Sequence, residues 1–174
     1  ISSGLREIIE GTAITKDFTH IYASSFYYNE HGEPCWPAQV INYTNKTQFL
    51  FRIEKGILDI NDNAVNDHFA EGELRVPFRN IVYIGDSATD IPCMRLVNSL
   101  GGHSVGVYDL ENTESKDTVR RMIRDERIRY YVPADYTKGS EMDTLMHQII
   151  DKTAAYEVLE EKHLRDRKEA VAKY

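Results

Sequence analysis

The segment from residue 80 to residue 94 constrains the fold of this chain more than any other stretch. Its core, Ile81-Val-Tyr-Ile84, is apolar throughout, which is typical of a strand buried on both faces of a parallel sheet. The apolar run ends in Gly85-Asp86, and helix-starting residues and a second acid, Asp90, follow at once. Because open α/β sheets bind ligands at the carboxyl ends of their strands, we expect Asp86 there and Asp90 about one helical turn further on.

Two carboxylates in one small volume repel each other unless a cation or a lysine neutralises them. Oxygen ligands of this kind suit Mg²⁺. The spacing therefore predicts that Asp86 and Asp90 belong to a divalent-metal or lysine site. The alternative is that both acids only cap the helix that follows, a position that Asp favours.

Strand and helix patterns alternate after residue 80. This alternation predicts an α/β fold with a doubly wound, mainly parallel sheet. The last helix begins after Ser140, and its charged continuation lacks Gly and Pro, so we expect one long C-terminal helix. The expected strands cover residues 81–84, 104–108 and 130–132, and the expected helices cover residues 88–100, 115–125 and 140 onward.

The part of the chain before residue 80 predicts smaller elements. Apolar spacing over Leu5–Glu10 indicates a short helix. Aromatic and β-branched residues on either side of a turn cluster predict a β-hairpin or flap over Phe18–Tyr43. A helix is expected from Thr44 to Gly56, and the polar stretch Asn61–Val76 is expected to be a loop with at most a short helix.

Composition narrows the class of protein. With 174 residues the chain is long enough for a single domain with one core. Its net charge of -7 argues against nucleic acid or an anionic membrane as partner. Cys35 and Cys93 fit no metal-ligand spacing and are expected to be free thiols of a cytoplasmic protein. No apolar run approaches the length of a membrane span.

The segment Gly85-Asp-Ser-Ala-Thr-Asp90 after an apolar strand resembles the fourth motif of the haloacid dehalogenase (HAD) superfamily of hydrolases, in its phosphoserine-phosphatase-like branch. Two other pieces occur in the order of that family. Ile1-Ser-Ser-Gly4 is similar to the end of the second motif, and Lys46 is similar to the lysine of the third motif. The resemblance spans residues 1 to about 136, and the fourth motif is its specific part.

The resemblance implies a Rossmannoid core and the hydrolysis of a phosphomonoester, with a phosphorylated small molecule as substrate. An aspartate nucleophile forms an aspartyl-phosphate, and Mg²⁺ bridges it to the phosphate. Asp86 would ligate the metal, and Asp90 would approach it through water or hold Lys46. Lys46 would offset the charge of nucleophile and phosphate, and Ser2, with Ser3 beside it, would donate a hydrogen bond to a phosphate oxygen.

The first motif of that family, Asp-x-Asp after a buried strand, does not occur in this sequence. By the resemblance, residues 1–174 are a partial core domain with motifs two to four, and the nucleophile, the general acid and the cap domain lie upstream. A central strand would be missing as well, which leaves the core incomplete. We therefore expect the chain alone to be inactive and the N-terminal segment to be supplied by a longer protein or as a separate chain.

Other interpretations remain open at this stage. The chain could be a non-catalytic HAD-like scaffold or phosphate-sensing module that binds a partner through an exposed sheet edge. A receiver-like domain is the weaker alternative, because its acidic cluster should follow an early strand that is not present. For single residues, Lys46 could be a solvated surface charge and Ser2 a helix cap. The six histidines show no metal-ligand spacing and are assigned no chemistry.

Overall fold

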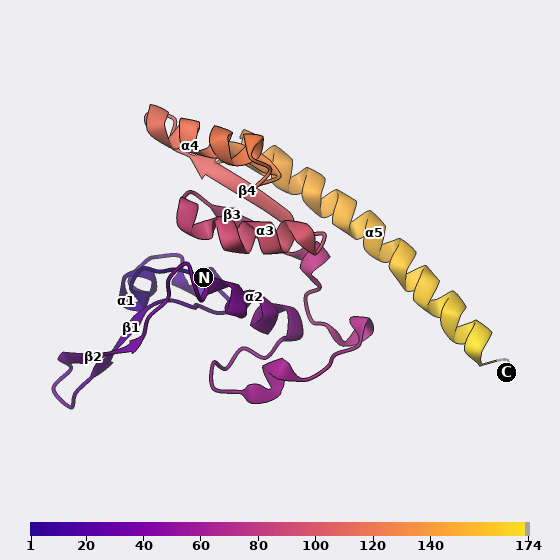
Figure 1. The fold of residues 1–174 in the computed structure, drawn as a ribbon, viewed down its shortest axis with the longest axis horizontal. Helices are drawn as coiled ribbons and strands as arrows, with labels where there is room; N and C mark the ends of the chain where they lie inside the picture. The colour runs from indigo at the N-terminus through magenta and orange to yellow at the C-terminus, as the bar shows by residue number, and fades with distance from the viewer. Residues whose placement is uncertain (173–174) are drawn as a thin grey trace.

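Three parallel strands form the central sheet of this protein, in a computed structural model that describes residues 1–172. They are β3 (Val82–Gly85), β4 (His103–Tyr108) and β5 (Tyr130–Pro133), arranged in that order (Figure 1). Within the described residues, β3 pairs with β4 and with no second strand, so β3 is an edge strand. Ile84 at this edge is 40% exposed.

Helices cover both faces of the sheet. On one face, α3 (Ile91–Ser99) and α4 (Thr113–Arg124) bury Cys93, Met94, Val97, Val119 and Met122 against the strands. On the other face, the first half of α5 (Glu141–Val171) packs Met142 and Ile149 against the valines of β4 and β5. Alternate residues of each strand point to opposite faces, so the apolar strands feed both of these clusters.

The C-terminal helix α5 is 31 residues long. It begins where the Ser140 hydroxyl accepts a hydrogen bond from the Asp143 backbone N–H at 3.1 Å, which makes Ser140 the N-cap of the helix. Its second half runs beyond the sheet (Figure 1), and every residue from 161 to 170 is exposed. Only the first half of the helix therefore contributes to the core.

The N-terminal part contains an extended segment, α1 (Arg6–Glu10), the hairpin β1 (Ser25–Tyr28) and β2 (Pro34–Gln39), and α2 (Lys46–Lys55). Backbone hydrogen bonds join residues 2–6 to residues 22–24 in parallel, for example from Ser2 N to Tyr22 O at 2.8 Å. The hairpin projects away from the main sheet (Figure 1). Five single-turn 3₁₀ helices complete the structure: Thr15–Asp17, Asn63–Asn66, Glu71–Glu73, Phe78–Asn80 and Ala88–Asp90.

The coarse prediction of a mixed α/β fold with a parallel sheet is confirmed, and a doubly wound topology stays a prediction. The hairpin differs from expectation. Its strands are shorter than the predicted range 18–43 because residues 22–24 pair with the N-terminal segment instead. Among residues 1–172, no helix has both the length and the apolar character needed to cross a bilayer.

Candidate functional site

A cavity of about 350 Å³ opens at the carboxyl end of β3. Three segments that are distant in the sequence form most of its lining: the N-terminal residues, the first turn of α2, and the end of β3 with the loop that follows; β4 and the segment after β5 add one residue each. Such an end of a parallel sheet is the usual place for ligands in α/β folds. The lining residues are Ile1, Ser2, Ser3, Lys46, Ile84, Gly85, Asp86, Ser87, Thr89, Asp90, Val107 and Tyr136.

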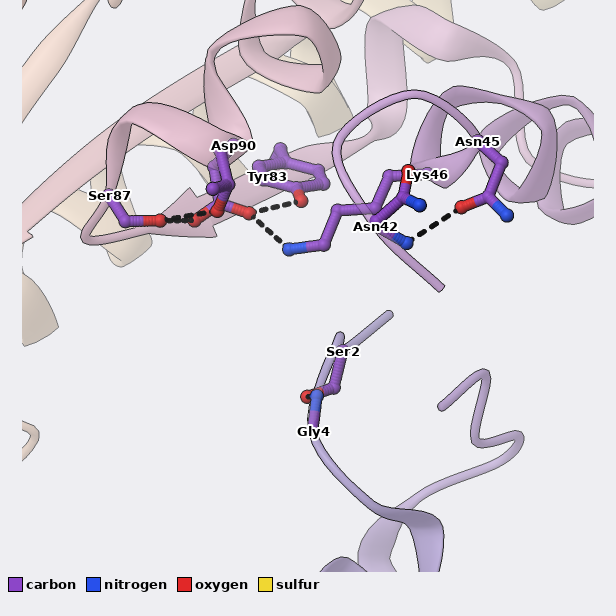
Figure 2. Close-up of polar contacts among 9 residues, drawn as sticks. Ser2, Gly4, Asn42, Asn45, Lys46, Tyr83, Ser87 and Asp90 are labelled. Carbon is purple, nitrogen blue, oxygen red and sulfur yellow. Dashed lines mark hydrogen bonds and ion pairs between the residues drawn. The ribbon is translucent and has the colours of Figure 1, made fainter. Parts of the chain in front are cut away.

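A buried ion pair joins two of these segments (Figure 2). The Lys46 Nζ lies 2.7 Å from Asp90 Oδ1, and the two residues are only 4% and 6% exposed. Lysine is almost never fully buried unless it is paired. Of the two alternatives that the sequence left for Asp90, the structure therefore contains the contact with Lys46, and Lys46 is not a solvated surface charge.

Two hydroxyl groups complete the surroundings of the Asp90 carboxylate. The Tyr83 hydroxyl of β3 donates to Oδ1 at 2.8 Å, and the Ser87 hydroxyl donates to Oδ2 at 3.1 Å. Burial by itself raises the pKa of Asp90, but the hydrogen bonds from Lys46, Tyr83 and Ser87 outweigh it and hold that pKa below its ordinary value. Asp90 is thus an anion that accepts hydrogen bonds at both oxygens.

Tyr83 is a buried hydrogen-bond donor to Asp90. Only 8% of its surface is exposed. Burial first, and then the Asp90 charge, raise the pKa of the Tyr83 hydroxyl far above its ordinary value. The hydroxyl therefore keeps its proton at any physiological pH and donates a hydrogen bond to Asp90.

Gly85 allows Asp90 to approach the strand closely. A Cβ added at position 85 would lie 2.8 Å from the Cβ, the Cγ and Oδ2 of Asp90, which is closer than such atoms pack. A side chain at position 85 would therefore displace the carboxylate. Glycine at position 85 thus has a steric reason, because it leaves room for the Asp90 carboxylate beside the end of β3.

A local turn places Lys46 at the start of α2. The Asn45 side chain accepts a hydrogen bond from the Asn42 backbone N–H at 2.8 Å and donates to the Val40 carbonyl at 2.8 Å. The Lys46 backbone N–H donates to the Asn42 carbonyl at 3.1 Å. This turn leads into α2, which begins at Lys46 with Asn45 as its N-cap, and the Lys46 side chain reaches Asp90 (Figure 2).

Ser2 and Ser3 line the same cavity, and neither forms a hydrogen bond with Lys46 or Asp90. The Ser2 hydroxyl accepts a hydrogen bond from the Gly4 backbone N–H at 3.0 Å (Figure 2). Helix α1 begins after Leu5, whose side chain forms no cap, so Ser2 does not act as the helix cap that the alternative interpretation required. The role of Ser2 and Ser3 in phosphate binding stays a prediction.

Asp86 lies in the cavity lining and is exposed. Mg²⁺ prefers six oxygen ligands in near-octahedral geometry. Within residues 1–172, no group of three or more Asp, Glu, His or Cys side chains is placed to hold a metal ion. Lys46, Tyr83 and Ser87 already occupy both oxygens of Asp90. Asp86 is therefore the one carboxylate of the cavity that is available as a Mg²⁺ ligand, and residues 1–172 do not supply a complete Mg²⁺ site.

The two alternatives for Asp90 are also distinguished by its contacts. It stands at the N-cap of α3, yet its side chain makes no capping hydrogen bond. Its contact with Lys46 favours the role of holding the lysine over that of a direct metal ligand. Whether Asp86 and Asp90 contribute to metal binding stays a prediction.

Sequence reasoning missed two residues of the cavity region, Tyr83 and Tyr136. Tyr83 could have been found from strand alternation, because it lies two residues before Gly85 and so points to the face that α3 covers. Tyr136 follows β5 and reaches the cavity rim, and it is 64% exposed. No pattern in the sequence marks Tyr136, since its place depends on the order of the strands.

Comparison with known proteins gives little guidance on function. No family model matches this chain, and no solved structure matches it. Among curated proteins, the chain is similar to an uncharacterized protein of Borreliella burgdorferi, with 23% identity over 156 residues. That alignment covers 82% of this chain and 53% of the relative, so the chain spans about half the length of the relative that it matches.

Proposed function

We propose that this chain is the C-terminal part of a Mg²⁺-dependent, HAD-like phosphatase that hydrolyses phosphomonoesters, within a doubly wound core. The supporting observation is the buried pair of Lys46 and Asp90 in a cavity that Ser2 and Asp86 also line. A buried ion pair contributes little net stability, because the desolvation of the two charges opposes their attraction. A role in binding an anion would explain why Lys46 and Asp90 are buried together.

The chain's own residues would act on the phosphate as follows. Asp90 fixes the Lys46 ammonium beside the cavity, where this cation stabilises negative charge that builds up on phosphate oxygens during transfer. Ser2 would donate its hydroxyl hydrogen to one phosphate oxygen. Asp86 would hold Mg²⁺, which, when bound, neutralises further charge on the phosphate.

The nucleophile of this proposal is an aspartate outside residues 1–174. Its carboxylate would form a bond to phosphorus while the bond from phosphorus to the ester oxygen breaks, and the general acid of the longer protein would protonate that oxygen so that it leaves as an alcohol. Water would then hydrolyse the acyl phosphate to inorganic phosphate and restore the aspartate carboxylate. The free edge of β3 is consistent with an additional segment that would pack next to the site. Ile84 at this edge is 40% exposed, and β3 has no second strand partner among residues 1–172. Residues from that segment would complete the metal ligands.

Phosphate release by the protein translated from the whole reading frame tests this proposal. We expect release that EDTA abolishes, and a fall in kcat of about 10²–10³ for Lys46→Ala, as for other preorganised groups that stabilise transition-state charge. Lys138→Ala is the matched control, because Lys138 is an exposed loop lysine. Release that persists in EDTA, or that Lys46→Ala leaves unchanged, would overturn the proposal.

A second candidate is a non-catalytic module that binds phosphate or a partner. It is favoured by one observation, the absence of an Asp-x-Asp motif from this chain. Light scattering coupled to size-exclusion chromatography distinguishes the two. A stable assembly of this chain that binds inorganic phosphate, without any phosphatase activity in the longer protein, would support the module.

A further inference from the structure

The surroundings of Asp90 divide its two oxygens between different tasks. Oδ1 accepts two hydrogen bonds, from Lys46 Nζ at 2.7 Å and from the Tyr83 hydroxyl at 2.8 Å. Oδ2 accepts from Ser87 at 3.1 Å. Oδ1 is therefore held by two elements at once, by Lys46 from α2 and by Tyr83 from β3.

We infer that Tyr83 is a positioning residue for the candidate site: its hydroxyl fixes Asp90 Oδ1 so that the Lys46 ammonium is held beside the cavity. As a statement about catalysis, this inference rests on the proposed phosphatase function. As a statement about the placement of Lys46, it rests on the contacts alone. Tyr83 does not line the cavity, so it acts through Asp90 and not on a ligand.

Rigidity distinguishes Tyr83 from the other hydroxyl at Asp90. Tyr83 belongs to a hydrogen-bonded strand and packs in the core with Cys93 and Met94, both fully buried. Ser87 lies in the loop after the strand, and its hydroxyl also contacts Thr89 at 2.7 Å. The strand therefore provides the fixed reference for the carboxylate, and the loop provides an adjustable one.

Tyr83 is the one partner of Oδ1 besides Lys46 among the described residues. Without the tyrosine hydroxyl, Oδ1 keeps only the hydrogen bond from Lys46, and the remaining hydroxyl contact is that of Ser87 with Oδ2 at 3.1 Å. The carboxylate can then turn about its Cβ–Cγ bond, and Lys46 can follow it towards solvent. The loss of one hydrogen bond to a charged group changes such an equilibrium by about tenfold or more.

Lysine labelling tests this inference without requiring catalysis. This chain and its Tyr83→Phe variant are treated with formaldehyde and cyanoborohydride, and the methylation of each lysine is followed by peptide mass spectrometry. We expect Lys46 to be protected in the parent chain and to react about tenfold faster in Tyr83→Phe. Lys138, an exposed loop lysine, serves as the internal reference and should not change.

Tyr22→Phe is the matched control, because Tyr22 is also buried, at 3% exposure, and donates its hydroxyl elsewhere, to the Leu58 carbonyl at 2.7 Å. An unchanged rate at Lys46 in Tyr83→Phe would overturn the inference. An equal increase in Tyr22→Phe would overturn it too, since the effect would then reflect general loosening.

Ser87→Ala gives a second arm, which stands even where Tyr83→Phe fails to fold. Because Ser87 holds the other oxygen and its loss leaves both hydrogen bonds to Oδ1 in place, we expect Lys46 to react at most about threefold faster in this variant. A tenfold increase in Ser87→Ala would assign the positioning role to the loop and overturn the inference.

Kinetics of the longer protein separate this inference from the proposed function. If phosphatase activity exists, Tyr83→Phe should lower kcat and leave KM nearly unchanged, because a misplaced lysine loses mainly transition-state stabilisation. If no activity exists and the labelling pattern holds, the proposed function fails and the positioning of Lys46 by Tyr83 stands.

Discussion

Ion pairs fasten both ends of the sheet, and they differ in burial. At the carboxyl end, Lys46 and Asp90 have side chains only 6% and 9% exposed. At the amino end, Arg79 pairs with Glu157 of α5 at 2.8 Å and with Glu71 at 2.9 Å, and its side chain is 22% exposed against 33% for Glu157.

The partners of the two pairs explain the difference. Arg79 ties the loop before β3 to α5, and its guanidinium also lies 5.6 Å from the ring of Tyr156. Because water reaches this ion pair, its contribution to stability is small, and its role is to attach α5 to the segment before β3. For the Lys46 pair, desolvation offsets much of the attraction between the charges, so its net contribution to stability is far smaller than the cost of removing one partner.

The largest expected effect comes from breaking the buried pair. Asp90→Ala leaves the Lys46 ammonium buried without its counter-charge, so we expect the free energy of unfolding to fall by about 3–5 kcal/mol. Urea denaturation followed by circular dichroism measures this. Asp166→Ala is the control, because Asp166 pairs with Lys162 where both side chains are more than half exposed, at 58% and 68%. A loss below about 1 kcal/mol for Asp90→Ala would place both pairs in the same class.

A smaller effect is expected at Gly85. In Gly85→Ala the added methyl group meets Asp90 at 2.8 Å, and relief of this overlap should lower stability by about 1–3 kcal/mol. Thermal unfolding measures the change. Gly72→Ala is the matched control, since a Cβ there meets nothing within 4 Å. Equal stability of the two variants would show that Asp90 can move away from β3 freely.

Acid should weaken the buried pair in a defined direction. The folded-state pKa of Asp90 lies below its ordinary value of 3.8, so its contribution is present above that pH and is lost as the pH falls through the folded-state pKa. We expect the urea midpoint of the parent chain to fall more steeply between about pH 5 and pH 2 than that of Asp90→Asn. Parallel curves for the two proteins would contradict this.

The smallest effect is expected at the amino end. Glu157→Gln keeps the shape of the side chain and removes its charge, and the pair with Arg79 is partly exposed. We expect a loss of about 0.2–1 kcal/mol, which high salt reduces further. Urea denaturation at low and high salt measures it. A loss as large as that of Asp90→Ala would remove the contrast between the two ends.

Local patterns in the sequence predicted most of the regular structure. The apolar run at residues 81–84 and the helical pattern after Ser140 each specify an element through near neighbours. The hairpin was predicted too long, because pairing between residues 2–6 and 22–24 is a long-range contact that no local pattern encodes.

The site was predictable in part for the same reason. Asp86, Asp90 and Lys46 carry charges whose order along the chain could be interpreted, and the structure brings Lys46 to Asp90 across 44 residues. Tyr83 was missed because a tyrosine in a buried strand is read as packing until its hydroxyl is seen to face a carboxylate. The metal and phosphate roles stay predictions, since they depend on groups that residues 1–172 do not supply.

The second half of α5 carries a practical consequence. Residues 161–170 are all exposed, and they include Lys162, Arg165, Arg167 and Lys168. A helical turn without tertiary support unwinds at little free energy, which admits trypsin to four cleavage points. Brief digestion should therefore trim this end in steps and leave a resistant body that retains the cavity.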